Sequence, residues 1–397
     1  MATLTIEDLD LKGKNVVMRV DFNVPLKDGR ITDDNRIVQA LPSINYVLDN
    51  GGLLVLLSHL GRPKGEPKPE FSLKPVADYL SEKLSAKVHF AEDCIGEKAR
   101  SAVAAASPGE VVLLENVRFH AGETKNNAEL SEEFASLGDV FINDAFGSSH
   151  RAHCSVAGIT KFLQPAAAGY LLEKEIRFLS DSVTTPDRPF VAVLGGAKVS
   201  DKIGVIRNLI DKVNTILIGG GMTYTFMKAK GLPIGSSMLE DDKVALAKEL
   251  MDEAAAHNVS LMLPVDSVVA QSFSNDVPFK TVGEDGIEDG WMALDIGEET
   301  TKLYCDKVRE ARTVIWNGPM GVFEMENFSK GTFALAQAMA EATKAGATTI
   351  IGGGDSASAI KVAGLEKEVS HVSTGGGASL EYLEGKELPG ITSLTQK

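Results

Sequence analysis

The second half of the chain contains FVAVLGGAK (190–198), NTILIGGGMT (214–223), TVIWNGPMG (313–321), TTIIGGGDS (348–356) and VSTGGGAS (372–379), five stretches in which a short apolar run ends at glycine or other small residues. Such a run is typical of a buried strand followed by a tight turn. Because glycine has no Cβ, backbone N–H groups in the turn can approach an anion closely, and a following helix adds its positive dipole end. A turn that needs positive φ explains any one stretch. The five together, with double and triple glycines, predict a sheet edge that holds a polyphosphate.

The whole chain alternates between strand-like runs and amphipathic, helix-like segments. In the first half, strands are expected at NVVMRVD (15–21), LLVLLSH (53–59), KVHFA (87–91), VVLLENV (111–117) and DVFINDAF (139–146). Helices are expected near 73–84, 128–138, 200–213 and 241–258. Apolar strands that alternate with helices predict parallel sheets covered on both faces, and 397 residues are enough for two such α/β domains.

A domain boundary is expected near TTPDRPF (184–190), a segment that contains two prolines. The preceding residues, 168–183, have a helical pattern that is charged on one face, so they are a candidate for a helix between the domains.

The charge and composition narrow the possible partners and the compartment. There are 40 basic and 55 acidic residues, and the net charge of −15 disfavours nucleic acid as the main partner. We expect no membrane span, because apolar runs stay shorter than about 18 residues, and no secretory signal is seen at the N-terminus. The three widely spaced cysteines, Cys94, Cys154 and Cys305, fit a reducing cytoplasm and argue against a disulfide framework or a cysteine-based metal site.

Cationic side chains follow the predicted strands of the first half. These side chains are Arg36, His59, Arg62, Arg118 and Arg151, with Asp21 and Asn23 beside them. A single arginine on a surface is usually paired with a nearby acid. Several that converge at strand ends predict a pocket for a compact anion, since the guanidinium fork matches phosphate and carboxylate groups. His150 and His153 are metal-ligand types, but two histidines three residues apart are a weak metal signal, and His89 is expected to be structural.

The second half offers lysines and carboxylates beside its glycines. If a helix begins near Val199, Lys198 lies at its start and Lys202 one turn in, so that both can face one phosphate. Asp355 follows Gly354 and suits either a Mg²⁺ ligand or a helix N-cap, and the sequence leaves both open. Glu324 could accept hydrogen bonds from ribose hydroxyl groups.

Known phosphate motifs do not describe this half. There is no G-x-x-x-x-G-K-[ST] loop and no protein-kinase glycine loop with a catalytic H-R-D. GGGDSA (352–357) satisfies G-x-G-x-x-A, but it follows one of the last strands and lacks an acidic residue about 20 positions later. A dinucleotide-dependent oxidoreductase and a non-catalytic phosphometabolite-binding protein are therefore the alternatives to a phosphotransferase.

The motifs RVDFNVP, SHLGRP, LLENVRF, INDAFGSSHRAH, GGAKVSDKI, IGGGMTYTF, WNGPMGVFE, IGGGDS and STGGGASLE together resemble phosphoglycerate kinase, in order and over the whole chain. The short segment 120–130 is typical of bacterial-type members. The resemblance implies two doubly wound, Rossmann-like domains in a cytoplasmic monomer: an N-terminal 3-phosphoglycerate domain (1–170), a hinge helix (171–185) and a nucleotide domain (186–387), with the tail 388–397 returning to the first domain. It also implies a glycolytic phosphotransferase that moves the acyl phosphate of 1,3-bisphosphoglycerate to MgADP, giving 3-phosphoglycerate and MgATP.

The resemblance further implies roles for particular residues. The 3-phosphoglycerate site falls on Asp21, Asn23, Arg36, His59, Arg62, Arg118 and Arg151. The nucleotide site falls on Lys202, Asn317, Glu324, Gly353, Gly354, Asp355 and Ser356, with Asp355 near Mg²⁺. Arg36, Lys198 and Lys202 would stabilise the transferring phosphoryl group, assisted by backbone N–H groups near Gly353 and Gly376. Since the leaving group of the acyl phosphate is a carboxylate, no general base is expected.

Overall fold

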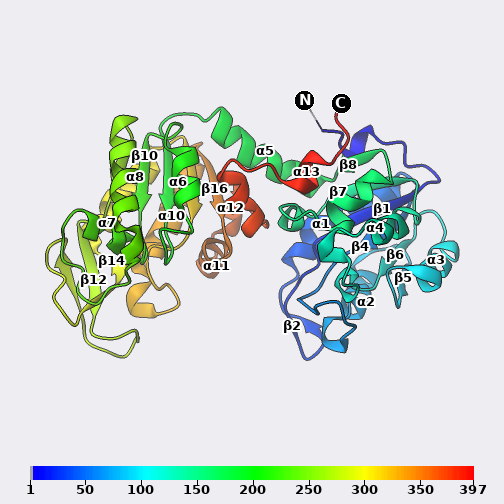
Figure 1. Ribbon diagram of the computed structural model, residues 1–397, viewed down its shortest axis with the longest axis horizontal. Coiled ribbons are helices and arrows are strands. Elements are labelled where there is room, and N and C mark those ends of the chain that lie inside the picture. Colours follow the sequence, from blue (N-terminus) through cyan, green and yellow to red (C-terminus); the bar gives the residue numbers. More distant parts are fainter. Residues whose placement is uncertain (1–2) are drawn as a thin grey trace. The chain divides into compact units, whose positions relative to one another are not determined.

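The computed structural model describes residues 3–397, which divide into two units (Figure 1). Unit 1 contains residues 3–176 and Glu387–Lys397, and unit 2 contains Arg177–Lys386. The division lies inside helix α5 (Tyr170–Thr184), ahead of the proline-bearing segment where we expected a boundary. Each unit has its own six-stranded parallel sheet with helices on both faces, so the predicted α/β fold class with two doubly wound sheets is confirmed.

The sheet of unit 1 has the strand order β5-β6-β4-β1-β7-β8, with β1 at its centre. Val17 of β1 pairs with Val55 of β4 on one side and with Phe141 of β7 on the other. The chain leaves β1 first toward β4 and later returns to β7, so the strand order reverses at β1. The strands are β1 (Asn15–Val20), β4 (Leu53–Leu57), β5 (Val88–Ala91), β6 (Val111–Leu114), β7 (Val140–Asp144) and β8 (Ala166–Ala168), and a hairpin of β2 (Leu26–Lys27) and β3 (Arg30–Ile31) follows β1.

The core of unit 1 forms because alternate strand residues meet apolar helix faces. Val16, Met18 and Val20 of β1 pack with Ile37 and Ile44 of the first helix on one face of the sheet. The helices of unit 1 that precede α5 are α1 (Asn35–Asp49), α2 (Lys74–Lys83), α3 (Gly96–Ala104) and α4 (Ala128–Ala135). This packing buries both faces of the central strands and leaves their carboxyl ends open to a ligand.

The C-terminal segment forms part of unit 1. Gly390 N donates to Ser149 O (2.8 Å), and Asn143 Nδ2 donates to Gly390 O (2.8 Å). Further along, Thr395 N donates to Ala166 O (2.9 Å), beside the short helix α13 (Pro389–Thr392). These hydrogen bonds attach the end of the chain to the loop after β7 and to the edge strand β8.

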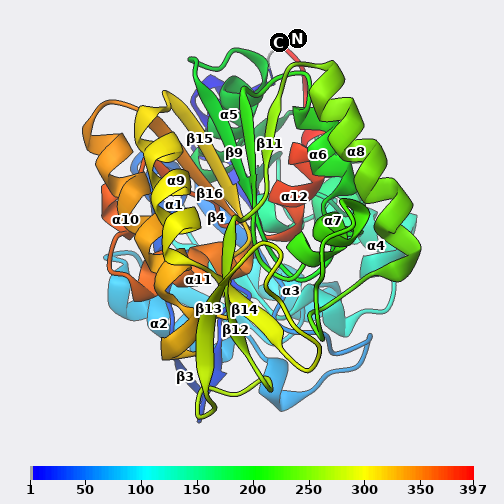
Figure 2. The same cartoon turned by 90° about the vertical axis from the view of Figure 1, so that its left-hand side faces the viewer.

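The sheet of unit 2 has the order β11-β10-β9-β15-β16-β17, and its strand order reverses between β9 and β15. Figure 2 shows α9 and α10 on one side of its strands and α6, α8 and α12 on the other. The strands are β9 (Phe190–Leu194), β10 (Thr215–Ile218), β11 (Ser260–Met262), β15 (Thr313–Asn317), β16 (Thr348–Gly352) and β17 (His371–Val372). The helices are α6 (Ile203–Leu209), α7 (Thr223–Ala229), α8 (Val244–Ala256), α9 (Glu298–Glu310), α10 (Lys330–Lys344), α11 (Gly354–Val362) and α12 (Gly377–Leu383).

Two features of unit 2 differ from the sequence expectation. A three-stranded antiparallel sheet, with β12 (Asp266–Ala270) between β13 (Phe279–Gly283) and β14 (Met292–Ile296), was not anticipated. The helix expected over 200–213 is shorter, since α6 begins only at Ile203. Lys202 is therefore the residue that precedes the helix and not a residue one turn inside it.

Two expectations from composition can be compared with the structure. Cys94, Cys154 and Cys305 are all free and buried, so none of them forms a disulfide. Within residues 3–397, no helix has both the length and the apolar character needed to cross a membrane.

Candidate active site

The cationic residues predicted in the first half lie beyond the carboxyl ends of four neighbouring parallel strands. Asp21 and Asn23 follow β1, His59 and Arg62 follow β4, Arg118 follows β6, and Arg151 follows β7. Arg36 lies in the first turn of α1. Because β6, β4, β1 and β7 are consecutive in the sheet, these loops share one edge, as the sequence predicted.

Asp21 organises the centre of this edge. Its carboxylate accepts a hydrogen bond from Arg36 and another from the backbone N–H of Asn23 (3.2 Å). Burial disfavours ionisation of Asp21, but the positive charges of Arg36 and Arg19 and the hydrogen bond from the backbone N–H of Asn23 oppose this effect, and the pKa of Asp21 is lowered to about 2. The carboxylate therefore stays ionised and holds the Arg36 guanidinium at the edge of the sheet.

Arg19 belongs to this edge and was missed by the sequence analysis. It is the fifth of the six residues of β1, near the carboxyl end of the strand, and its side chain is completely buried. Its Nη2 lies 3.0 Å from His59 Nδ1, and its Nε donates to Ser155 Oγ (2.8 Å). Ser155 Oγ in turn donates to Glu123 Oε1 (2.6 Å), which is also fully buried. The available signal was a single charged residue inside an otherwise apolar strand.

The contact with Arg19 fixes the state of His59. A guanidinium has only donors, so His59 Nδ1 must accept, and the ring carries its proton on Nε2. Burial, together with the charges of three arginines, holds the pKa of His59 well below its usual range, although Asp21 opposes this shift. His59 is therefore a neutral imidazole with one N–H group left to donate.

Arg118 also has donor capacity available for a ligand. Its Nη1 donates to Gly61 O (2.9 Å), whereas its Nε is buried and has no hydrogen-bond partner among residues 3–397. Burial lowers the pKa of Arg118 to about 10, so the side chain remains charged at neutral pH. Asn23 Oδ1 accepts from Gly61 N (2.8 Å), which positions the same loop.

Arg62 and Arg151 lie at the same edge with exposed side chains. In addition to burial, the positive charge of Arg62 lowers the pKa of Arg118, and the positive charge of Arg151 lowers the pKa of His153. His153 is largely buried, and burial lowers its pKa to about 4. His89, expected to be structural, contacts Glu110 through its ring (2.7 Å).

In unit 2, the predicted nucleotide residues other than Glu324 line one cavity of about 360 Å³ at the glycine-rich edge of the sheet. The lining residues include Lys198, Lys202, Asn317, Gly353, Gly354, Asp355, Ser356 and Gly376. They come from the loops after β9, β15, β16 and β17, and the reversal of strand order between β9 and β15 places these loops side by side.

Lys202 and Asn317 form the floor of this cavity. Lys202 Nζ donates to Asn317 Oδ1, and both residues are buried. Burial lowers the pKa of Lys202, while Asp201, Asp355 and Glu384 partly oppose this shift. Asn317 Nδ2 is buried without a hydrogen-bond partner among residues 3–397, which suits a donor that a bound anion would satisfy. Lys198, by contrast, is exposed at the rim.

Backbone geometry at two glycines shapes the cavity wall. Gly353 (φ 89°) caps α11 and Gly376 (φ 52°) caps α12, and these positive φ angles favour glycine. The N-cap interpretation of Asp355 is therefore wrong, because Gly353 occupies the cap and Asp355 is the second residue of α11. Its carboxylate is exposed and lines the cavity.

A neighbouring cavity of about 450 Å³ contains Glu324 and is also lined by Asp355. Apolar side chains, including Met238, Phe273, Leu294 and Val322, contribute much of its wall. A flat apolar group such as a nucleobase suits this surface, and Asp355 lies where the apolar and glycine-rich cavities meet.

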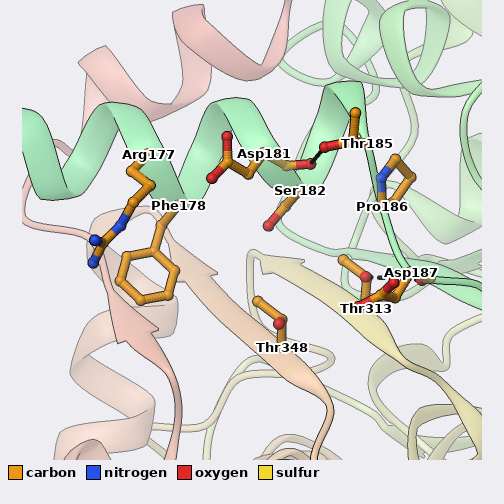
Figure 3. Close-up of a pocket in the computed structure, with 9 residues that line it drawn as sticks. All are labelled: Arg177, Phe178, Asp181, Ser182, Thr185, Pro186, Asp187, Thr313 and Thr348. Atoms are coloured by element: carbon orange, nitrogen blue, oxygen red, sulfur yellow. Dashed lines mark hydrogen bonds between the residues drawn. The ribbon is translucent and has the colours of Figure 1, made fainter.

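A third hollow, of about 200 Å³, lies at the opposite edge of the same sheet (Figure 3). It is lined by Arg177, Phe178 and Asp181 of α5 and by Thr313 and Thr348, the first residues of β15 and β16. Because ligands of open parallel sheets bind beyond the carboxyl ends of the strands, this hollow is not assigned to the substrates.

These features define an α/β protein of two doubly wound units, one with a cationic strand edge and the other with a glycine-lined strand edge. The family model described as phosphoglycerate kinase matches residues 6–386. The phosphoglycerate kinase of Clostridium novyi is 59% identical over 395 residues, which cover 99% of this chain and 98% of that protein. The phosphoglycerate kinase of Thermosipho africanus is 58% identical over 398 residues, covering 100% and 99% of the two chains.

A solved structure shows the same fold. The phosphoglycerate kinase of Coxiella burnetii superimposes with a TM-score of 0.90 at 44% identity, over 98% of both chains. The chain therefore belongs to the phosphoglycerate kinase family.

Proposed function

We propose that the protein catalyses the reversible transfer of the acyl phosphate of 1,3-bisphosphoglycerate to MgADP, giving 3-phosphoglycerate and MgATP in glycolysis. The observation that carries the proposal is that one chain of this family has two chemically different binding edges, one on the sheet of each unit. One edge presents arginines and a neutral histidine around Asp21, and the other presents glycines, Lys202 and Asp355. The first suits a small phosphorylated acid and the second suits a polyphosphate.

In this proposal the edge of unit 1 binds the phosphoglycerate. The anchors are Asp21, Asn23, Arg36, His59, Arg62, Arg118 and Arg151. Arginine forks bind the phosphate and carboxylate groups, and the buried Nε of Arg118 gains a partner when the substrate binds. Asp21 and Asn23 accept from the substrate hydroxyl group or orient the arginines, and His59 donates from Nε2.

The nucleotide occupies the two cavities of unit 2. Its base lies against the apolar wall of the larger cavity, and Glu324 accepts from ribose hydroxyl groups. Its phosphates lie along Gly353, Gly354 and Ser356, where Lys202 and Asn317 provide donors from the cavity floor.

Asp355 is the residue that would hold Mg²⁺. An exposed carboxylate between the two cavities fits an ion that prefers one or two carboxylates plus phosphate oxygens. When bound, Mg²⁺ neutralises charge on the phosphate oxygens and orients them.

The phosphoryl transfer needs positioned charge and no proton transfer. Arg36, Lys198 and Lys202 stabilise the transferring group, assisted by backbone N–H groups near Gly353 and Gly376. The carboxylate leaves without needing a proton, so no general acid is required, and the attacking phosphate oxygen of ADP is already ionised, so no residue serves as a general base. The neutral states of His59 and His153 do not contradict this assignment.

The proposal includes closure about the hinge helix α5, since the two substrates bind to different units. Closure would expel water that could otherwise hydrolyse the acyl phosphate. We expect the radius of gyration in solution scattering to fall when both substrates are present, and an unchanged value would contradict closure. A cytoplasmic monomer is part of the same proposal, and light scattering of the purified protein tests the monomer.

The decisive test is formation of an acyl phosphate from 3-phosphoglycerate and MgATP, trapped with hydroxylamine. We expect turnover by the wild-type protein and its collapse in Lys202→Ala, with Lys212→Ala, outside the cavity, as the matched control. Absence of turnover by folded protein that still binds nucleotide would contradict the proposal. Binding of NADH, followed by its fluorescence, would instead support the oxidoreductase alternative, and phosphoglycerate binding without turnover would support the non-catalytic one.

A further inference from the structure

Three side chains with different metal-binding atoms converge at the outer edge of the unit 1 sheet. Asp93, Cys94 and His120 each offer one ligand atom, and these atoms lie within 4.8 Å of one another. The pairing of the parallel strands β5 and β6 brings them together. Asp93 and Cys94 follow β5, and His120 comes six residues after the end of β6.

The cluster already has part of the arrangement that a metal site requires. His120 Nε2 lies 2.7 Å from Asp93 Oδ1, and the Cys94 backbone N–H donates to the same oxygen (2.7 Å). A tetrahedral zinc site has ligand bonds of about 2.0–2.3 Å, which places its ligand atoms ~3.5 Å apart. Ligand atoms that lie up to 4.8 Å apart must therefore approach by roughly 1 Å, whereas His120 Nε2 and Asp93 Oδ1, 2.7 Å apart, must separate by slightly less than that, and side-chain rotation can supply both movements.

The kinds of ligand atom indicate which metal fits. Thiolate and imidazole ligands are preferred by zinc and similar borderline-soft ions, whereas Mg²⁺ and Ca²⁺ prefer sets made only of oxygen. One carboxylate, one thiolate and one imidazole make three protein ligands, which is the number found in zinc sites that keep one position open. The cluster is thus chemically distinct from the carboxylate of Asp355.

A cavity of about 460 Å³ gives access to the cluster. Asp93 and His120 line it, together with the carboxylates of Glu92 and Glu115. Of the charged residues that line the cavity, Glu92, Asp93 and Glu115 are acidic and Lys68 is basic, so the lining has an excess of negative charge that favours entry of a cation, and the cavity leaves room for a water molecule as a fourth ligand. Cys94 is buried behind the lining residues, so the metal would bind at the cavity floor.

We propose that Asp93, Cys94 and His120 form a binding site for a zinc-like divalent cation, separate from the substrate-binding edge. The sequence argued against a cysteine-based metal site because the cysteines are far apart. This site needs only one cysteine, and its imidazole comes from a residue 26 positions later. Because Arg118 precedes His120 by two residues, an occupied site would also hold the segment that carries Arg118.

Cobalt(II) tests the proposal, because its thiolate complexes absorb in the near ultraviolet and tetrahedral coordination gives strong visible bands. Tag-free, metal-stripped protein is titrated with Co²⁺ and then with Zn²⁺. We expect one equivalent of Co²⁺ to develop both sets of bands, and Zn²⁺ to displace it. Cys94→Ser should abolish the near-ultraviolet band, and His120→Gln should weaken binding about tenfold or more.

Matched variants separate this site from other donors in unit 1. Cys154→Ser removes another buried free thiol, and His89→Gln removes another carboxylate-bound imidazole, and both should leave the bands unchanged. The proposal is overturned if wild-type protein develops no thiolate band, or if the band survives in Cys94→Ser. If Cys94→Ser does not fold, the half-exposed His120→Gln variant decides, and unchanged Co²⁺ affinity in that variant overturns the proposal.

Discussion

Nη2 of Arg19 lies 3.0 Å from Nδ1 of His59, in a region where both side chains are almost completely shielded from solvent. Because arginine can only donate, the contact dictates that His59 carries its single proton on Nε2. A residue that looks like part of the core thus determines which hydrogen bond His59 can offer to a substrate. The same contact places a positive charge beside the imidazole and opposes its protonation.

We expect His59 to keep the neutral Nε2–H form from about pH 5.5 to 8, through the interval in which an unperturbed imidazole titrates. The measurement is the set of imidazole nitrogen chemical shifts in ¹⁵N-labelled protein. In Arg19→Met the opposing charge is gone, so His59 should take up its proton at a higher pH, while the signals of His89 serve as the internal control. Titration of wild-type His59 near pH 6.5 would contradict the assignment.

Replacement of Arg36 by alanine should lower kcat while leaving KM for 3-phosphoglycerate less affected. The guanidinium, held by Asp21, supplies fixed charge where the transferring phosphoryl group develops it. By analogy with the loss of an oxyanion donor, we expect a cost of about 3 to 4 kcal/mol, or roughly 10²–10³ in kcat. Arg30→Ala, an exposed arginine nearby on β3, is the control. Near-normal turnover with a change only in KM would rule out this role for Arg36.

Nucleotide binding should be accompanied by proton uptake at alkaline pH. Burial lowers the pKa of Lys202, so at alkaline pH its amine loses its proton more readily than an exposed lysine does. A polyphosphate beside the amine favours its charged form, and binding must then draw a proton from solution. Calorimetric titration with MgADP at about pH 9, in two buffers of different ionisation enthalpy, measures this uptake. It should vanish in Lys202→Ala and persist in Lys198→Ala, and buffer-independent heats for the wild-type protein would contradict it.

Asp355→Asn should raise the Mg²⁺ concentration needed for half-maximal turnover, because the variant loses the carboxylate between the two cavities. Asp201→Asn removes another carboxylate that lines the phosphate cavity and is the matched control. Only the first variant should shift the Mg²⁺ dependence. An unchanged dependence in Asp355→Asn would remove this residue from the metal role.

The sequence predicted the parallel sheets well because their strands are continuous apolar runs, and a strand buried on both faces requires such a run. It failed for the small antiparallel sheet. In β13 (FKTVG), intermediate and exposed residues alternate and no continuous apolar run marks the strand. The start of α6 was also predicted wrongly. Residues 199–202 are polar apart from Val199, so no apolar pattern marks where the helix begins, and the conformation of this turn depends on neighbouring loops.

The residues of the candidate sites could also be predicted only in part from the sequence. Strand-end residues such as Arg118 and Asp355 were placed at the right edges because parallel strands align their carboxyl ends. Arg19 was missed because its partners, His59 and Ser155, are distant in sequence. The glycine-rich turns also have two different physical explanations, the binding of a ligand and the close packing of neighbouring loops. A Cβ on Gly195 would lie 2.1 Å from Pro319 O, so the close contact between two loops requires glycine at this position whether or not a ligand is bound.

Asp144 is a buried carboxyl group at the end of β7. Its Oδ1 accepts hydrogen bonds from the backbone N–H groups of Leu171 (2.8 Å) and Leu172 (3.1 Å), in the first turn of α5. Burial raises its pKa to about 7, although these bonds and a hydrogen bond with Ser43 partly oppose the shift. The folded protein therefore binds this proton more tightly than the unfolded chain does, whose aspartate titrates near 3.9.

The sign of the pH dependence follows from this difference. Between about pH 4 and 7 the folded state holds a proton that the unfolded state has lost, so the contribution of Asp144 to stability falls as pH rises, by about 4 kcal/mol at most. Asp144→Asn keeps an oxygen acceptor for the α5 amides but cannot titrate. The difference in urea midpoint between Asp144→Asn and wild type should therefore shift in favour of the variant from pH 4 to 7, and then stay constant. Asp285→Asn, an exposed carboxylate, should show no such trend, and a difference for Asp144→Asn that does not vary with pH would contradict the raised pKa.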